Sequence, residues 1–232
     1  WYFNGKDDDP AVHADYDEAV KKAEEYIDKV ANHLKADALV ICLTDETNFR
    51  RDIYPQYKHN RAGRRRPEYL SAIRDYLAET YQTYKRPGLE ADDCMGILAT
   101  HPSLIRGEKI MVSEDKDMKT IPAMLFNPEK DEKPRKVSET EAMRFHLEQT
   151  LTGDPTDGYP GCPGIGPKSS YVARVRKAKT LREGWQIVVE GYESRGLTED
   201  DAIVQARCAR ILRAQDWDFQ TKKPRLWLPP QN

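Results

Sequence analysis

Residues 38–45 read ALVICLTD and residues 109–117 read KIMVSEDKD, and these two stretches decide the fold class. Each is a short apolar run that ends in carboxylates, the pattern of a buried strand with polar side chains at its carboxyl end. Apolar residues at helical spacing predict helices over 16–34, 68–84 and 89–100, and a further apolar run predicts a strand over 123–126. Strands that alternate with helices indicate an α/β fold with a parallel sheet.

The chain after residue 137 follows a different pattern. Residues 128–138 (PEKDEKPRKVS) are expected to form a hairpin or a linker, because they are charged and rich in helix breakers, and Ser138 with Glu141 matches a capping box. Helices are predicted over 139–151, 168–178, 180–195 and 198–214. We therefore expect an α/β domain over 1–137 and a mainly helical domain over 138–232.

Composition excludes several classes of protein. The chain has 232 residues, a third of them charged, and no apolar run near the roughly 20 residues of a membrane-spanning helix. Its four cysteines are far apart and form no C-x-x-C pair, so neither a zinc site nor a disulfide framework is indicated. Reduced thiols fit a cytoplasmic protein, and we expect no membrane partner.

Basic residues are concentrated in two stretches, although the net charge is only −2. Residues 50–66 carry seven Lys or Arg against one acid, and residues 163–182 carry six against none. A charge run is usually a solvated face, but two such runs also suit a polyanionic partner.

Carboxylates recur where an α/β sheet has its functional edge. They follow the two strands, open the helix at 89–100 and occupy a polar turn, and the set is Asp45, Glu90, Asp92, Asp93, Asp115, Asp117, Asp154 and Asp157. A single acid at a helix start is explained by capping and the helix dipole. A converging set repels itself and normally binds Mg²⁺ or Mn²⁺, and two such ions beside basic loops suit phosphodiester hydrolysis.

A glycine-rich turn and a basic loop are candidate nucleic-acid contacts. Residues 153–170 read GDPTDGYPGCPGIGPKSS, in which the GIGPK core is typical of a helix-hairpin-helix turn that approaches a phosphate, although an ordinary Gly/Pro loop explains it too. In the other stretch aromatic residues alternate with cations, which suits single-stranded DNA or a strand end, unless the tyrosines only cover the core. The candidates there are Tyr57, Lys58, Arg61, Arg64, Arg65 and Arg66.

Five segments together resemble the 5′-nuclease superfamily of flap endonucleases, and within it the 5′→3′ exonucleases of T-seven-like bacteriophages. They are DETNFRRDIYPQYKHNR (45–61), GLEADDCMGILATHPS (88–103), VSEDKDMKTIP (112–122), GDPTDGYPGCPGIGPK (153–168) and ARILR (209–213). The resemblance implies a PIN-like α/β core with an arch over about 46–84, and a helical domain with a helix-hairpin-helix-type motif.

The same resemblance implies roles for the candidate residues. The eight carboxylates would hold two Mg²⁺ or Mn²⁺ ions, with Asp154 and Asp157 at the second position. Lys58 and Arg61 would contact the scissile phosphate. The hairpin would bind duplex DNA, with K⁺ on its backbone carbonyls, through Gly161, Gly164, Ile165, Gly166, Lys168 and Ser169.

The sequence thus predicts a Mg²⁺-dependent 5′→3′ exonuclease and flap endonuclease for DNA with a 5′ end or single-stranded 5′ arm, and, as in relatives, for RNA in RNA·DNA hybrids. The resemblance further implies a role in phage DNA replication or recombination in the host cytoplasm. The family begins with an apolar strand ending in a metal-binding Asp. This sequence starts at Trp1 without that strand, so we expect the true N-terminus to be missing. One alternative is therefore a catalytically silent protein that binds DNA structures, and another is a PIN-like ribonuclease.

Overall fold

The computed structural model describes residues 15–61, 63 and 67–231. Contacts within the chain divide it into two compact units, one formed by residues 1–43 with 63–84 and the other by residues 44–62 with 85–232. This division differs from the predicted boundary after residue 137, because the strands after residue 109 and the C-terminal helices pack within the same unit.

The smaller unit contains two helices and a two-stranded parallel sheet. Helix α1 (Tyr16–Leu34) starts at the predicted residue, where Asp15 caps it by accepting a hydrogen bond from Asp17 N, and it packs against α3 (Leu70–Thr80). Strand β1 (Ile41–Cys42) pairs with β2 (Thr83–Tyr84), with Ile41 opposite Thr83.

Two predictions for this unit need correction. Residues 38–43 were expected to form a strand buried on both faces, but β1 has two residues and both are only half-buried, because β2 is its single partner among the described residues. The helix expected over 68–84 ends at Thr80, since the backbone of Thr83 and Tyr84 is used in pairing with β1.

The larger unit contains a three-stranded sheet beside a short helix. Strand β3 (Ile110–Val112) lies parallel to β4 (Met124–Phe126), as predicted, and β4 pairs antiparallel with β5 (Arg135–Lys136). The 3₁₀ helix η2 (Lys116–Thr120) follows β3, and α4 (Ala91–Thr100) contacts β3. Apolar side chains of β3, β4 and η2 form one buried cluster with residues that follow η2 and β5 and with two residues from later in the chain: Met111, Met118, Ile121, Leu125, Val137, Ala142 and Ile211.

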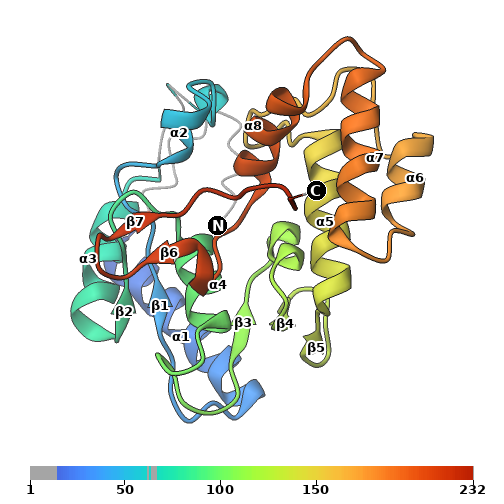
Figure 1. Ribbon diagram of the computed structural model, residues 1–232. Helices are drawn as coiled ribbons and strands as arrows, with labels where there is room; N and C mark the ends of the chain where they lie inside the picture. The colour runs from blue at the N-terminus through green and yellow to red at the C-terminus, as the bar shows by residue number, and fades with distance from the viewer. Residues whose placement is uncertain (1–14, 62, 64–66, 232) are drawn as a thin grey trace. The chain divides into compact units, whose positions relative to one another are not determined.

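Four helices form the other half of this unit, and Figure 1 shows them grouped together. They are α5 (Glu139–Thr152), α6 (Ser170–Val175), α7 (Leu181–Glu193) and α8 (Glu199–Ala209). Helix α5 contacts the other three, and it also packs against η2. Ser138 caps α5 by accepting from Glu141 N at 3.1 Å, as its sequence predicts. A helix cap of this kind contributes about 1 kcal/mol.

Short elements complete the larger unit, and the sequence did not predict its two hairpin strands near the C-terminus. They are α2 (Arg50–Ile53), η1 (His59–Arg61), η3 (Ala214–Asp216), β6 (Trp217–Asp218) and β7 (Lys223–Pro224). Of the helices in the described part of the chain, none combines the length and apolarity needed to cross a membrane.

Candidate active site

The loop at residues 54–61 is held against the turn at residues 154–158 by backbone contacts. Lys58 N donates to Asp157 O at 2.7 Å, and Asn60 Nδ2 donates to Pro155 O at 2.7 Å. Gly158 has a φ of +73° and lies so close to the loop that a Cβ would meet Gln56 O at 3.3 Å. Two segments about a hundred residues apart are therefore fixed as one surface.

Lys58 links carboxylates from two elements at this surface. Its ammonium forms an ion pair with Glu90, which precedes α4, and lies 3.4 Å from Asp157. The Tyr57 hydroxyl lies 3.0 Å from Glu90 Oε2 and 2.9 Å from Asp157 Oδ2, and Arg61 pairs with Asp157 at 2.8 Å. The loop's cations are thus already directed at the predicted acids.

Lys116 links a second pair of carboxylates. Its ammonium lies 2.8 Å from Asp117 Oδ1 and 2.5 Å from Asp154 Oδ2. Gln149 of α5 donates from Nε2 to the same Asp117 oxygen at 2.5 Å, and the buried Gln149 Oε1 has no hydrogen-bond partner among the described residues. The polar turn and η2 are joined by this group.

The electrostatics of the two groups show that they belong to one site. Burial raises the pKa of Asp92 to about 7, and the charges of Asp115, Glu90 and Asp93 add to that rise. Burial also raises the pKa of Tyr159 well above its ordinary value, with further contributions from the acids of both groups. The Tyr159 ring stacks on Tyr57 at 6.3 Å between centroids. Carboxylates from α4, η2 and the turn therefore interact with one another.

Neighbouring cations decide which acids stay ionised. Burial alone would raise the pKa of Glu90, but Arg50 and Lys58 lower it below its ordinary value. Burial alone would also raise the pKa of Asp154, but Lys116 lowers it below its ordinary value. The pKa of Asp117 is raised by burial and by Asp115, against the effect of Lys116.

Asp93 has a different environment from the one expected of a metal ligand. Its carboxylate is fully buried and accepts four hydrogen bonds: Oδ2 from Arg50 Nη1 (2.8 Å) and Glu90 N (3.2 Å), and Oδ1 from Arg50 Nη2 (2.7 Å) and Leu212 N (3.0 Å). These contacts use the lone pairs that a metal would need. The structure gives Asp93 the role of anchoring Arg50 and the start of α4.

Asp45 also differs from the expectation. It accepts from Gly88 N at 2.9 Å and from Thr47 Oγ1 at 2.8 Å, and it pairs with Lys85 at 3.3 Å. The hydrogen bonds to Gly88 and Thr47 lower its pKa far below the ordinary value, so it is a stable anion. These hydrogen bonds and this ion pair join the loop at 44–47 to residues 85–88, and none of the partners is another predicted acid.

The remaining six carboxylates have the oxygen donors that a divalent metal requires, but their side chains are not arranged around a common point at metal-binding distance. In the described ranges no three His, Cys, Asp or Glu side chains are arranged to hold a metal ion. Oxygen donors are nevertheless the ligands preferred by Mg²⁺ and Mn²⁺. The ammonium groups of Lys58 and Lys116 lie between pairs of these acids, where they supply the positive charge that such a cluster requires.

The glycine turn combines a buried base with an exposed tip. Gly161 has a φ of +67°, and a Cβ there would lie 2.2 Å from Gly153 N; its own N–H donates to Gln205 Oε1 at 2.9 Å. Ile165 is buried, whereas Gly164, Gly166 and Lys168 are exposed. The Ser169 hydroxyl caps α6 by accepting from Val172 N.

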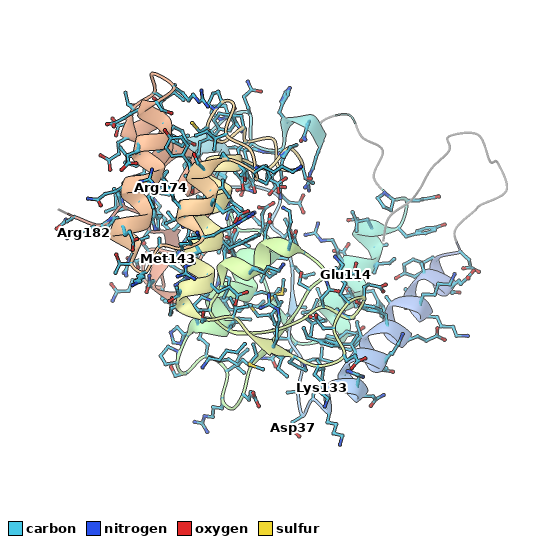
Figure 2. All side chains as sticks on the ribbon, turned by 90° about the vertical axis from the view of Figure 1, so that its right-hand side faces the viewer. Asp37, Glu114, Lys133, Met143, Arg174 and Arg182 are labelled. Atoms are coloured by element: carbon cyan, nitrogen blue, oxygen red, sulfur yellow. The ribbon has the colours of Figure 1, made fainter. Side chains whose placement is uncertain are left out.

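The cations after this turn are partly neutralised. Arg174, labelled in Figure 2, pairs with Glu190 at 2.7 Å, and Arg176 pairs with Glu148. The predicted contacts Arg64, Arg65 and Arg66 lie outside the described residues.

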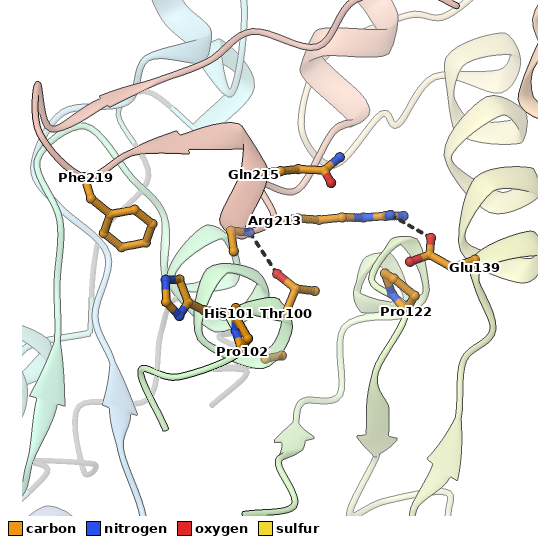
Figure 3. Close-up of a pocket in the computed structure, with 10 residues that line it drawn as sticks. Thr100, His101, Pro102, Pro122, Glu139, Arg213, Gln215 and Phe219 are labelled. Atoms are coloured by element: carbon orange, nitrogen blue, oxygen red, sulfur yellow. Dashed lines mark hydrogen bonds and ion pairs between the residues drawn. The ribbon is translucent and has the colours of Figure 1, made fainter. Parts of the chain in front are cut away.

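The pocket in Figure 3 has a volume of about 540 Å³ and is separate from these carboxylates. Its lining includes His101, Glu139, Arg213 and Phe219, and Arg213 pairs there with Glu139 at 2.9 Å. None of the eight acids predicted to bind metal lines this pocket.

Sequence reasoning missed three residues of the site. Lys116 lies between the predicted ligands Asp115 and Asp117 in the sequence, and its position in the D-x-D pattern could have identified it as part of the site. Gln149 and Tyr159 reach the acids through the packing of α5 and the turn, which no local pattern indicates.

Comparison with known sequences finds similarity to exonucleases and flap endonucleases. A model of the N-terminal resolvase-like domain of 5′-3′ exonucleases matches residues 11–140. The exonuclease of Escherichia phage T7 is 32% identical over 223 residues, which cover 82% of this chain and 74% of that protein. The flap endonuclease Xni of Shewanella pealeana is 32% identical over 224 residues, covering 83% and 82%.

Solved structures share the fold at lower identity. A bacteriophage T5 protein co-crystallised with metal ions superposes with a TM-score of 0.62 and 18% identity, over 82% of this chain and 86% of that one. A bacteriophage T5 flap endonuclease in a pseudo-enzyme–product complex with DNA and metal ions superposes with a TM-score of 0.59 and 17% identity, over 82% and 84%.

Proposed function

The chain belongs to the 5′-3′ exonuclease family with an N-terminal resolvase-like domain, and we propose that it hydrolyses DNA phosphodiesters by a mechanism that uses two Mg²⁺ ions. The family makes it a hydrolase of the 5′→3′ exonuclease and flap endonuclease type. Its proposed substrates are duplex DNA with a 5′ end or 5′ flap, and RNA in RNA·DNA hybrids. We propose that the protein acts on replicating or recombining DNA in the bacterial cytoplasm, and its relatives in phages and bacteria support this proposal.

One observation carries this proposal: carboxylates from the start of α4, from η2 and from the turn at 154–158 lie close enough to share ammonium groups, Lys58 between Glu90 and Asp157 and Lys116 between Asp117 and Asp154. Acids crowded in this way without a structural need are characteristic of functional sites. We propose that Glu90, Asp92 and Asp115 hold one Mg²⁺, and that Asp154 and Asp157 contribute to a second, together with Asp117, which shares the Lys116 ammonium with Asp154. When bound, these ions would supply an activated water and stabilise the leaving oxygen.

Lys58 and Arg61 are the proposed contacts of the scissile phosphate. Both side chains are directed at the acids from a loop whose backbone is fixed to the turn, so little reorganisation is needed when substrate binds. Fixed cations near a phosphate stabilise the charge that develops during hydrolysis. The half-buried Lys58 contacts both Glu90 and Asp157, whereas the more exposed Arg61 contacts Asp157.

The glycine turn is the proposed grip on duplex DNA. Gly166 is exposed, and a Cβ there would meet nothing within 4 Å, so a phosphate could approach this backbone directly. Exposed Lys168 adds positive charge beside it. Contacts of this kind bind the DNA backbone without reading sequence. We propose that backbone carbonyls of the same turn bind K⁺.

The direct experiment is cleavage of a 5′-labelled flap substrate in Mg²⁺, with EDTA as the negative control. The double variant Asp115→Asn, Asp117→Asn should lose cleavage and still bind the substrate in a gel-shift assay. Matched RNA·DNA and single-stranded RNA substrates define the range and separate this proposal from a PIN-like ribonuclease. Full turnover by the double variant would contradict the proposed site.

A further inference from the structure

We infer that Lys116 is an internal counter-ion that a divalent metal must displace from Asp117 and Asp154, so that this lysine sets the metal affinity of the site. The inference rests on the proposed function, because it takes these two acids as metal ligands. Its ground is the placement of one ammonium between them, at 2.8 Å and 2.5 Å.

The two acceptor oxygens face the same point, which the ammonium now occupies. Both oxygens lie within hydrogen-bond distance of a single nitrogen, so they are at most 5.3 Å apart, the sum of 2.8 and 2.5 Å. An ammonium and a metal ion cannot occupy the space between these oxygens together. Binding of a divalent ion to both acids therefore exchanges one cation for another.

The acids are held in place independently of the lysine. Asp154 Oδ1 accepts from Thr156 N at 2.7 Å, and Asp117 Oδ1 also accepts from Gln149 at 2.5 Å. The backbone of η2 is fixed because Asp115 accepts from Asp117 N at 2.8 Å. If Lys116 moves away, these contacts keep both carboxylates facing the same point.

The lysine side chain has a path into solvent. Its side chain is 59% exposed, whereas those of Asp117 and Asp154 are 15% and 6% exposed. A long side chain at the surface can reach solvent by rotation alone. The exchange thus replaces a mobile charge of +1 by a charge of +2 and leaves the ligands in position.

A matched control lies in the same 3₁₀ helix. Lys119 carries the same charge, but its ammonium lies over the Phe145 ring at 5.8 Å, and no ion pair joins it to a carboxylate of the described residues. Lys119→Met therefore removes one positive charge from η2 without freeing the acids. Lys116→Arg keeps the charge at the bridging position, and Lys116→Met removes it.

The test is a titration of each variant of the 232-residue chain with Mn²⁺, monitored by electron paramagnetic resonance at fixed pH and salt. Lys116→Met should bind Mn²⁺ about tenfold more tightly at this site, the factor for removing one competing charge-assisted contact. Lys116→Arg and Lys119→Met should stay within about twofold of the original chain, as expected for changes away from the exchange. Equal affinity of Lys116→Met and the original chain would overturn the inference.

Thermal unfolding gives a second readout that does not depend on turnover. In EDTA, Lys116→Met should unfold at a lower temperature than Lys119→Met, because Asp117 and Asp154 then repel each other, and Mn²⁺ should reverse that order. An unchanged order would count against the lysine's role. Failure of the original chain to bind Mn²⁺, or binding that survives Asp117→Asn with Asp154→Asn, would instead overturn the proposed function.

Discussion

Arg50 and Asp93 form a buried two-pronged ion pair, with nitrogen–oxygen distances of 2.8 Å and 2.7 Å and with neither side chain more than 3% exposed. The Arg50 guanidinium also donates to the carbonyl oxygens of Cys208 and Arg210, and Asp93 accepts from Leu212 N. The pair therefore fixes α4, which carries Asp92, to the chain after α8.

Replacing one partner of this ion pair should lower the free energy of unfolding of the larger unit. Asp93→Asn leaves the Arg50 charge buried without its partner, which costs about 3–5 kcal/mol in comparable pairs. We expect that loss in urea unfolding in EDTA. The double variant Arg50→Met, Asp93→Asn should be more stable than the sum of the two single changes predicts. A loss below about 1 kcal/mol for Asp93→Asn would show that the pair does not anchor α4.

Alanine substitutions of Gly161 and Gly166 should affect different properties, stability for Gly161 and DNA binding for Gly166. Gly161→Ala places a Cβ against Gly153 at a positive φ, so we expect a loss of about 2 kcal/mol or more in the free energy of unfolding. Gly166→Ala meets no atom and should leave stability unchanged while weakening duplex DNA binding in a low-salt gel shift. Unaltered binding by Gly166→Ala would remove the turn's tip from the DNA contact.

His146 should make the protein less stable in acid. Burial lowers its pKa to about 3, with Arg210 contributing, and its Nε2 lies 2.8 Å from Ala206 O. The unfolded chain binds the proton near pH 6.5 and the folded one does not, so this contribution is complete above that pH and is lost as pH falls toward 3. His146→Gln should flatten the fall in stability between pH 6 and pH 4. Parallel curves for the two proteins would contradict this assignment.

Lys58 should matter for hydrolysis more than for binding. Lys58→Met removes the cation beside Glu90 and Asp157, and we expect cleavage to fall about 10²- to 10³-fold, as when one stabilising group is lost from a transition state. Arg51, exposed on α2, is the matched control, and Arg51→Met should cleave at the original rate. Single-turnover rates at saturating protein separate cleavage from binding, and equal rates for both variants would exclude the role of Lys58.

The sequence predicted local elements better than it predicted partners. Helix α1 and the Ser138 cap follow from side-chain spacing and local hydrogen bonding, which are written within a few residues. The breaker-rich segment at 128–138 was predicted to be a hairpin or a linker, and the antiparallel pairing of β5 with β4 makes it a hairpin, although two residues in a charged segment give no periodic signal for the strand itself. The same limit applies to the site: D-x-D spacing placed Asp115 and Asp117, but only packing shows that Asp93 is saturated by Arg50.

The central claim is that acids from distant parts of the chain converge to bind divalent cations. The most direct measurement is the anomalous difference map of a crystal soaked in Mn²⁺. We predict one peak enclosed by Glu90, Asp92 and Asp115 and a second beside Asp154, with the ammonium of Lys116 turned toward solvent. A map without a peak at these acids, with Lys58 and Lys116 still paired to them at saturating Mn²⁺, would contradict the account.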